Sequence, residues 1–493
     1  MGVVVRQSFI TSALSYVGAI IGYFNVLWLF PKLLDREEIG LLRTLIDAAM
    51  LLVPLAQFGI SSSVVRFFPH FKHDNDEKRT FLSNLVVLSL IGYVFFGAAF
   101  LIFENEIASL FTKNSPKIVP YFKIVLAITL VLATTAILEA YSRSLLKVVI
   151  PNFIKEILVR VFTSVAVFFY GFEYLNIHQL MNCMVIVYGL SLLALAAYLY
   201  YLKQLNFKIN FNIFKRTTRL NILKFSLFSV LSGSAGLIVM KVDSLMVSVM
   251  IGLDENAIYT MAFFMAVVIE MPRRAISQVM SPLLAYNFKH NKLGETKSLY
   301  RKASINQLAI GLLLFIGIIA NLDNLYYLIP KWRLFQEGKI VVFIIGIGKL
   351  IDMTAGVNSE IIAMSKYYRF NIIAVGVMAI LTILGNYILI PILGLKGAAL
   401  GSALSIVVFN LIKLIFIQQK FRIQPFSINT IKAILIGLLA FYLSTWIPKL
   451  NDIFLDLLIR SAFITIVYGT LILKFRVSNE VNRFYQDFKK TIL

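Results

Sequence analysis

The sequence predicts an all-α polytopic membrane protein with about fourteen transmembrane helices. The mean hydropathy is +0.83 and only 15% of the residues are charged, values far from those of water-soluble domains. The apolar stretches are roughly 20 residues long, enough to cross a hydrocarbon core of ~30 Å as helices. The loops between them alternate between strongly basic and nearly neutral, as in polytopic membrane proteins. A closed barrel would instead need short alternating strands.

In chain order, the hydropathy pattern predicts spans at 8–30, 41–66, 81–103, 121–141, 153–172, 180–202, 223–250, 257–280, 304–328, 339–364, 370–392, 398–418, 431–448 and 456–473. The first stretch is too long for a signal-peptide core and lacks a small-residue cleavage site. We therefore expect it to be retained as the first span.

The basic loops predict the orientation, because Lys and Arg accumulate on the cytoplasmic side. With the N-terminus in the cytoplasm, three inner loops hold most of the basic residues: Arg66, Lys72, Lys78 and Arg79; Lys203, Lys208, Lys215, Arg216, Arg219 and Lys224; and Lys289, Lys292, Lys297, Arg301 and Lys302. An even number of spans then places both termini in the cytoplasm. Because the net charge of +22 lies mostly in these loops, it indicates orientation and not nucleic-acid binding.

The longest basic connection divides the first twelve spans into two sets of six. We predict an N-lobe at 1–205, a basic cytoplasmic linker at 206–222, a C-lobe at 223–420, and spans 13 and 14 with a cytoplasmic tail at 421–493. The alternating segment 207–212 suits either the inner leaflet surface or a solvated linker.

The two predicted lobes carry traces of a parallel repeat, because three short features recur about 217 or 218 positions later. The features are Ile39-Gly40-Leu41 with Ala257-Ile258-Tyr259, Pro54 with Pro272, and Phe71-Lys72-His73 with Phe288-Lys289-His290. Chance matches among common membrane residues are the competing explanation.

The residues available for catalysis are few. The only cysteine is Cys183, and the histidines are His70, His73, His178 and His290, without metal-binding helical spacing. The sequence has no phosphate-binding Gly-rich loop with Lys-Ser/Thr, no His-Glu-x-x-His and no Gly-x-Ser-x-Gly. We therefore expect no enzymatic activity and no cofactor, with energy coming from ion gradients or from the flow of the cargo.

Charges within spans are costly unless they are paired or solvated, and they usually mark function. They are Arg43 and Asp47 in span 2, Lys241 and Asp243 in span 7, Glu270, Arg273 and Arg274 in span 8, and Lys349, Asp352 and Glu360 in span 10. Pairing within one helix is the alternative for residues three or four apart, although not for Lys241 and Asp243, which are two apart. Lys349 lies close to the midplane, about ten residues from its outer boundary.

Two prolines, Pro54 and Pro272, lie at matching places in spans 2 and 8, where each is expected to kink its helix and allow gating. Gly346, Gly348 and Gly356 either loosen span 10 or permit close helix packing.

Three segments resemble polysaccharide-biosynthesis exporters of the multidrug, oligosaccharidyl-lipid and polysaccharide exporter (MOP) superfamily. They are 40–69, which ends in Gly59-Ile60-Ser61-Ser62-Ser63-Val64-Val65-Arg66-Phe67-Phe68-Pro69; 241–272, with Lys241-Val242-Asp243-Ser244; and Pro391-Ile392-Leu393-Gly394-Leu395-Lys396-Gly397-Ala398-Ala399-Leu400-Gly401. The resemblance implies a MATE-like fold, with two six-helix lobes around a cavity lined by spans 1, 2, 7 and 8 that opens alternately to either side of the bacterial cytoplasmic membrane.

The resemblance also implies the cargo, a polyprenyl-diphosphate-linked oligosaccharide moved to the outer leaflet for O-antigen, capsule or a similar polysaccharide, as by Wzx-type flippases. Spans 13 and 14 resemble the extra pair of MurJ-type lipid II flippases. Span 1 lacks the arginines of that type, which argues against lipid II as cargo. We expect a monomer surrounded by membrane lipids, with a polysaccharide polymerase and glycosyltransferases as partners.

An anionic diphosphate needs cationic side chains to replace its hydration. We therefore expect Arg43, Lys241, Arg273, Arg274 and Lys349 to bind substrate, and Asp47, Asp243, Glu270 and Asp352 to act as counter-ions or to couple transport to H⁺ or Na⁺. Two other functions compete: a cation-coupled multidrug exporter, in which acidic cavity residues should outnumber basic ones, and a membrane acyl- or glycosyltransferase, which would need a buried His or paired carboxylates.

Overall fold

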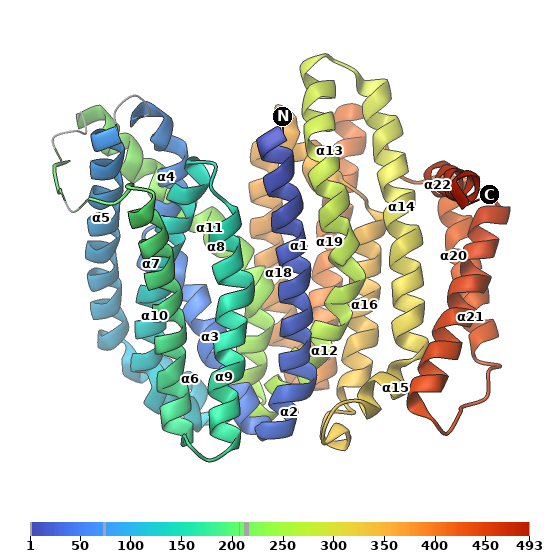
Figure 1. Ribbon diagram of the computed structural model, residues 1–493, viewed down its shortest axis with the longest axis horizontal. Helices are drawn as coiled ribbons and strands as arrows, with labels where there is room; N and C mark the ends of the chain where they lie inside the picture. Colours follow the sequence, from blue (N-terminus) through green and yellow to red (C-terminus); the bar gives the residue numbers. More distant parts are fainter. Residues whose placement is uncertain (1, 72–74, 207, 212–215, 493) are drawn as a thin grey trace. The chain divides into compact units, whose positions relative to one another are not determined.

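The computed structural model describes residues 2–71, 75–206, 208–211 and 216–492, which form helices joined by turns (Figure 1). The chain divides into two compact units, an N-terminal unit at Met1–Ala257 and a C-terminal unit at Ile258–Leu493. Of the predicted inner-loop residues, Lys72, His73 and Lys215 lie outside the described residues, as do residues 207 and 212–214 of the predicted linker.

The N-terminal unit contains α1 to α11 and the start of α12. Their bounds are α1 Gly2–Phe24, α2 Phe30–Leu33, α3 Arg36–Ala56, α4 Ile60–Phe67, α5 Asn75–Ile102, α6 Glu104–Thr112, α7 Phe122–Ser144, α8 Val149–Phe153, α9 Val159–Gly171, α10 Ile177–Tyr201, α11 Arg216–Met250 and α12 Leu253–Val267. Two π-helical turns, Asn25–Leu29 and Ile154–Leu158, continue α1 into α2 and α8 into α9 without a break.

The C-terminal unit contains the rest of α12 and ten further helices. They are α13 Met271–Lys289, α14 Leu293–Ala320, α15 Leu322–Tyr327, α16 Gly338–Thr354, α17 Asn358–Met364, α18 Tyr368–Leu393, α19 Leu395–Phe421, α20 Ile428–Ser444, α21 Ile453–Lys474 and α22 Asn479–Ile492.

Among the described residues, ten helices are long and apolar enough to cross a membrane, or eleven if α16 and α17 form one bent span. Helix α20 is apolar but shorter. The predicted span at 153–172 is helical but passes through a π-turn, and the one at 257–280 contains a 3₁₀ turn at Val268–Glu270. All fourteen predicted stretches are therefore largely helical, and those at 8–30, 41–66, 153–172, 257–280, 304–328 and 339–364 are interrupted by a turn or by a change of helix type.

Helix starts follow local sequence signals. Asp35 begins α3 with a capping box, in which Glu38 Oε2 accepts from the Asp35 amide at 2.9 Å. Asn176 begins α10 in the same way with Gln179. The α3–α4 break follows Pro54, and Gly59 adopts a φ of +68°, a conformation that glycine tolerates best.

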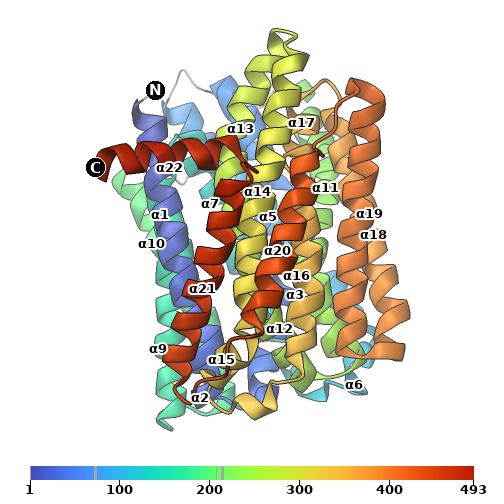
Figure 2. The same ribbon diagram turned by 90° about the vertical axis from the view of Figure 1, so that its right-hand side faces the viewer.

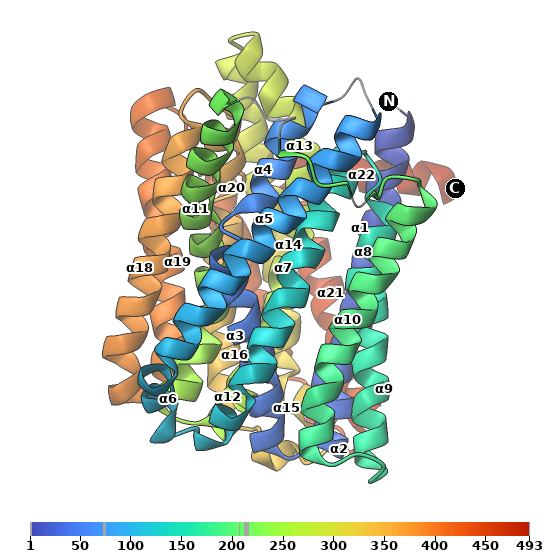
Figure 3. The ribbon, with the colours of Figure 1, turned by 90° about the vertical axis from the view of Figure 1, so that its left-hand side faces the viewer.

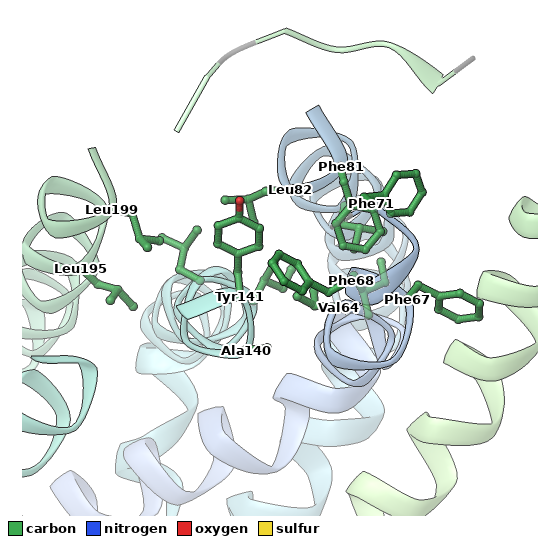
Figure 4. Packing of buried hydrophobic residues seen from close by; sticks show 14 of the residues in the cluster. Val64, Phe67, Phe68, Phe71, Phe81, Leu82, Ala140, Tyr141, Leu195 and Leu199 are labelled. Carbon is green, nitrogen blue, oxygen red and sulfur yellow. The ribbon is translucent and has the colours of Figure 1, made fainter. Parts of the chain in front are cut away.

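One core of the N-terminal unit packs α4, α5, α7 and α10 at one end of the bundle (Figures 3 and 4). Tyr141 is fully buried there and meets Phe68 edge to face at 5.5 Å between ring centroids. The backbone of Asn210 is bound at this end, since its carbonyl accepts from Asn84 Nδ2 at 2.8 Å and its amide donates to Asn84 Oδ1 at 3.0 Å. This part of the predicted linker therefore packs against α5.

In the C-terminal unit, α20 and α21 pack against α14 through a separate apolar core (Figure 2). Beyond α21, the last helix α22 lies across the direction of α21 (Figure 2). At the opposite end, Asp323 accepts hydrogen bonds from Lys339 and Lys449, both at 2.7 Å. The α20–α21 loop is thus tied to α15 and α16.

Candidate functional site

The first group of membrane-depth charges joins α3 to α11. Asp47 is fully buried, and its carboxylate lies 2.6 Å from Arg43 Nε on the same helix and 2.7 Å from Lys241 Nζ on α11. The ion pair of Arg43 with Asp47 within one helix is therefore present, but Asp47 also pairs with Lys241 on a second helix. We call Arg43, Asp47 and Lys241 the N-terminal charge cluster.

Close helix packing sets this geometry. Gly40 allows α3 to approach the start of α12 closely, because a Cβ at this position would lie 1.9 Å from the Leu253 carbonyl oxygen. One turn further, Thr44 Oγ1 lies 2.6 Å from Ser248 Oγ on α11 and accepts from Asn256 Nδ2 at 2.9 Å. The hydroxyl also donates to the Gly40 carbonyl at 2.7 Å. These buried polar contacts fix α3 against α11 and so place Lys241 next to Asp47.

The second group lies in the C-terminal unit, between α16 and the junction of α12 with α13. Lys349 Nζ is 2.5 Å from Glu270 Oε2, and Arg273 Nη1 donates to Asp352 Oδ2. Arg273 Nη1 also lies 3.7 Å from Glu270 Oε1. We call Glu270, Arg273, Lys349 and Asp352 the C-terminal charge cluster.

Sequence spacing predicted some of these pairs and missed others. Lys349 and Asp352 are three apart on α16, yet each binds a residue from the α12–α13 junction. The four side chains are between 9% and 19% exposed, so two cations and two carboxylates compensate one another in a largely buried place. The cluster therefore joins two spans.

The remaining predicted site residues are more scattered. Asp243 on α11 is buried, while Arg274 is exposed, one residue after the partly buried Arg273. Pro54 lies two residues before the end of α3, and its carbonyl accepts from the Gly59 amide at 3.1 Å. Pro272 lies in the first turn of α13, directly after the 3₁₀ turn. Each proline is thus next to an interruption in its span.

The glycines of span 10 were expected either to permit close helix packing or to loosen the helix, and the structure has an example of each. A Cβ on Gly348 would lie 3.2 Å from Ala403 Cα on α19, which indicates close helix packing. Gly356 has a φ of +66° and lies in the turn between α16 and α17, which are bent by 46°.

Two polar groups in the predicted spans were missed. Arg160 Nη2 lies 2.7 Å from Glu156 Oε2, and the Arg160 carbonyl accepts from Asn25 Nδ2 at 3.1 Å, so span 5 is fastened to span 1. Buried Arg460 is 2.9 Å from Asp456 Oδ1 and donates to the Ser444 carbonyl at 2.9 Å, which caps the end of α20. Spacings of four residues could have indicated both ion pairs.

A third omission is Lys413 on α19, whose side chain is 1% exposed. Its Nζ donates to Ser359 Oγ at 2.6 Å and lies 3.6 Å from the centroid of the Phe409 ring. Asn410, one turn earlier, donates to Asp352 Oδ1 at 2.9 Å. A lone lysine near a span end gave no sequence signal of this burial.

The comparisons with known proteins define the class. Residues 4–288 match the family described as polysaccharide biosynthesis protein. This match covers more than half of the chain, which therefore belongs to that family, a family of multi-pass membrane transporters of the MOP superfamily. No curated protein sequence matched the chain.

Several solved structures share the fold. The lipid II flippase MurJ, in an inward closed conformation, aligns with a TM-score of 0.78 at 15% identity, over 95% of this chain and 98% of that one. A MATE in complex with MaL6 aligns with a TM-score of 0.56 at 15% identity, over 85% and 96%. A MOP superfamily transporter from Pyrococcus furiosus gives 0.56 at 14%, over 85% and 95%. At these identities the likeness establishes the fold alone.

Proposed function

We propose that this protein is a flippase that moves a polyprenyl-diphosphate-linked oligosaccharide from the inner to the outer leaflet of the bacterial cytoplasmic membrane, for surface polysaccharide synthesis. The observation that carries the proposal is the pairing of largely buried cations, 14% to 17% exposed, with carboxylates, at Lys241 with Asp47, at Lys349 with Glu270 and at Arg273 with Asp352. Family membership supplies the link to polysaccharide synthesis.

The pairs suit a cargo with an anionic headgroup. A diphosphate cannot enter hydrocarbon without compensation for its charge, and arginine binds phosphate oxygens in a fork geometry. In the empty protein the carboxylates compensate the cations, which would otherwise be costly to bury. The cargo would take the place of the carboxylates, while its polyprenyl chain stays in lipid. The exposed Arg274 would add an attractive charge.

Release of the cations from the carboxylates offers a way to couple transport to an ion gradient. Protonation of Asp47, Asp243, Glu270 or Asp352, or Na⁺ binding to one of them, would weaken its hold on the neighbouring cation. Cargo binding and ion binding would then favour each other, without covalent chemistry and without a cofactor.

We further propose that all fourteen helical stretches cross the membrane, as two parallel six-helix lobes followed by α20 and α21, with both termini in the cytoplasm. Alternating access would proceed by rocking of the lobes about a cavity lined by spans 1, 2, 7 and 8. The interruptions beside Pro54 and Pro272 would serve as points of bending.

Two related transport functions, those of a lipid II flippase and of a multidrug exporter, would require a different cargo. Lipid II is less suited, because residues 7–31 contain no charged side chain and Asn25 is occupied with Arg160 and Ser164. A cation-coupled multidrug exporter would need carboxylates free to bind an organic cation. In the C-terminal charge cluster, each carboxylate instead faces a basic residue.

Reconstituted vesicles provide the test of function. A fluorescent polyprenyl-diphosphate oligosaccharide would be flipped by the wild type, and Lys349→Ala and Arg273→Ala should each abolish flipping. Lys396→Ala, which changes an exposed lysine on α19, is the matched control and should stay active. Thermal unfolding would verify that the variants are folded.

Full activity in both variants would contradict the assignment of these residues. Transport of an organic cation but not of the lipid-linked sugar would favour the multidrug exporter. Repeating the assay after collapse of the H⁺ and Na⁺ gradients and of the membrane potential tests coupling, since an unchanged rate would exclude it.

A further inference from the structure

The bent span formed by α16 and α17 is bound on both sides of its break by one face of α19. Asn410 donates to Asp352 Oδ1 on α16 at 2.9 Å and accepts from Asn358 Nδ2 on α17 at 2.8 Å. Lys413, three residues further along α19, donates to Ser359 Oγ on α17 at 2.6 Å. Residues three apart share a helix face, so both contacts belong to one packing surface.

These contacts join into a directed chain of hydrogen bonds. Lys413 donates to Ser359, Ser359 Oγ donates to Asn358 Oδ1 at 3.3 Å, Asn358 donates to Asn410, and Asn410 donates to Asp352. Every donor is oriented toward the carboxylate, which also accepts from Arg273. Aligned hydrogen bonds polarise and strengthen one another, so the chain favours a charged and fixed Asp352.

Lys413 has no carboxylate of its own within ion-pair distance among the residues that the structure describes. Its ammonium is buried, and its contacts are Ser359 and the face of the Phe409 ring at 3.6 Å. A buried cation without a direct partner is costly unless other groups compensate it. Here the compensating charges are Asp352, reached through three polar side chains, and Glu360 on α17.

The break itself is a buried turn that joins α16 to α17. Gly356 has a φ of +66°, and the Thr354 carbonyl, at the end of α16, accepts from Ser304 Oγ on α14 at 2.6 Å. The α16 side is therefore bound from both α14 and α19, whereas Asn358 and Ser359 on α17 are bound from α19. A change of the bend at Gly356 would stretch the hydrogen-bond chain at Asn358 and Ser359.

We propose that Lys413 is a positioning residue that holds α17 to α19 and, through Ser359, Asn358 and Asn410, holds Asp352 against Arg273. A change in the bend at Gly356 breaks this chain and releases Arg273 toward an anionic headgroup. Lys413 itself does not contact the cargo. The release of Arg273 toward cargo rests on the proposed function, whereas the attachment of α17 to α19 by Lys413 does not.

The first experiment measures the mechanical part by hydrogen exchange of the protein in lipid nanodiscs, without cargo. Lys413→Met keeps a side chain of similar length but removes the donor, and should speed amide exchange in α17, residues 358–364, roughly tenfold, as expected for losing one hydrogen bond from a charged group. Ser359→Ala should have the same effect, and the double variant should exchange no faster in α17 than either single variant.

Lys396→Met, on the exposed outer face of the same helix, is the matched control and should leave exchange in α17 unchanged. If Lys413→Met does not fold, Ser359→Ala carries the test, because it leaves the charge in place. Unchanged exchange in α17 with Ser359→Ala, or with a folded Lys413→Met, overturns the proposal.

The second experiment is a double-mutant cycle of flipping rates in vesicles. Lys413→Met should speed flipping about tenfold at a limiting concentration of the probe, because Arg273 is then released more easily. It should have no further effect when Asp352→Asn is already present, because Lys413 acts through Asp352. Effects that multiply would overturn the link to Asp352, and slower flipping in Lys413→Met would overturn the release of Arg273. If no variant and no wild type flips the probe, the proposed function fails, and hydrogen exchange still decides whether Lys413 holds α17.

Discussion

At the scale of single residues, ion-pair partners on other helices explain why charges are tolerated in the spans. Spacing within one helix indicated Arg43 with Asp47, but Lys241 comes from α11, which is 194 positions further along the chain. Partners of this kind depend on helix packing, which no local pattern specifies. The charges and the pair of Glu270 with Arg273 were therefore predictable, whereas the pairing of Lys349 with Glu270 and of Arg273 with Asp352 was not.

Asp47 provides a test at this scale. Asp47→Ala should lower the free energy of unfolding by about 3–5 kcal/mol, because it leaves Arg43 and Lys241 without their shared carboxylate. The measurement is the unfolding midpoint of the purified protein in detergent. Asp76→Ala, which removes an exposed carboxylate 3.5 Å from Arg79, should cost at most about 1 kcal/mol. Equal effects of the two substitutions would show that the N-terminal charge cluster contributes no more than a surface pair.

At the scale of helices, hydropathy predicts the positions of the spans. Prolines and glycines predict only some of the interruptions within them. Pro54 and Pro272 indicated the breaks in spans 2 and 8. The π-turns at Asn25–Leu29 and Ile154–Leu158 gave no signal, because neither segment contains a proline or a glycine. Each turn lies where span 1 meets span 5 through Asn25, Glu156 and Arg160, so tertiary packing accounts for them.

Helix packing can be tested at Gly40. Gly40→Ala would bring a Cβ to 1.9 Å from the Leu253 carbonyl oxygen, so α3 must move away from the start of α12. We expect a loss of about 1–3 kcal/mol, typical of overpacking, and a lower unfolding temperature. Gly97→Ala, on α5, would place its Cβ in open space and should be neutral or slightly stabilising. A neutral Gly40→Ala would contradict the close approach of α3 to Leu253.

At the scale of the whole molecule, the sequence carries two kinds of information. Hydropathy and family membership together define a multi-pass transporter of the MOP superfamily. The distribution of Lys and Arg predicts which ends of the helices face the cytoplasm. The orientation of the cargo pathway, from the inner to the outer leaflet, depends on this second property.

Single cysteines would establish the orientation. Cys183 is the only cysteine, so Cys183→Ala gives a cysteine-free background. In it, Asn451→Cys, in the exposed α20–α21 loop, should react with a membrane-impermeant maleimide in intact cells, because that loop is predicted to be outside. Gly294→Cys, at the exposed start of α14 in a strongly basic loop, should react only after the membrane is permeabilised. The reverse pattern would place the basic loops outside and would turn the proposed direction of lipid export into import.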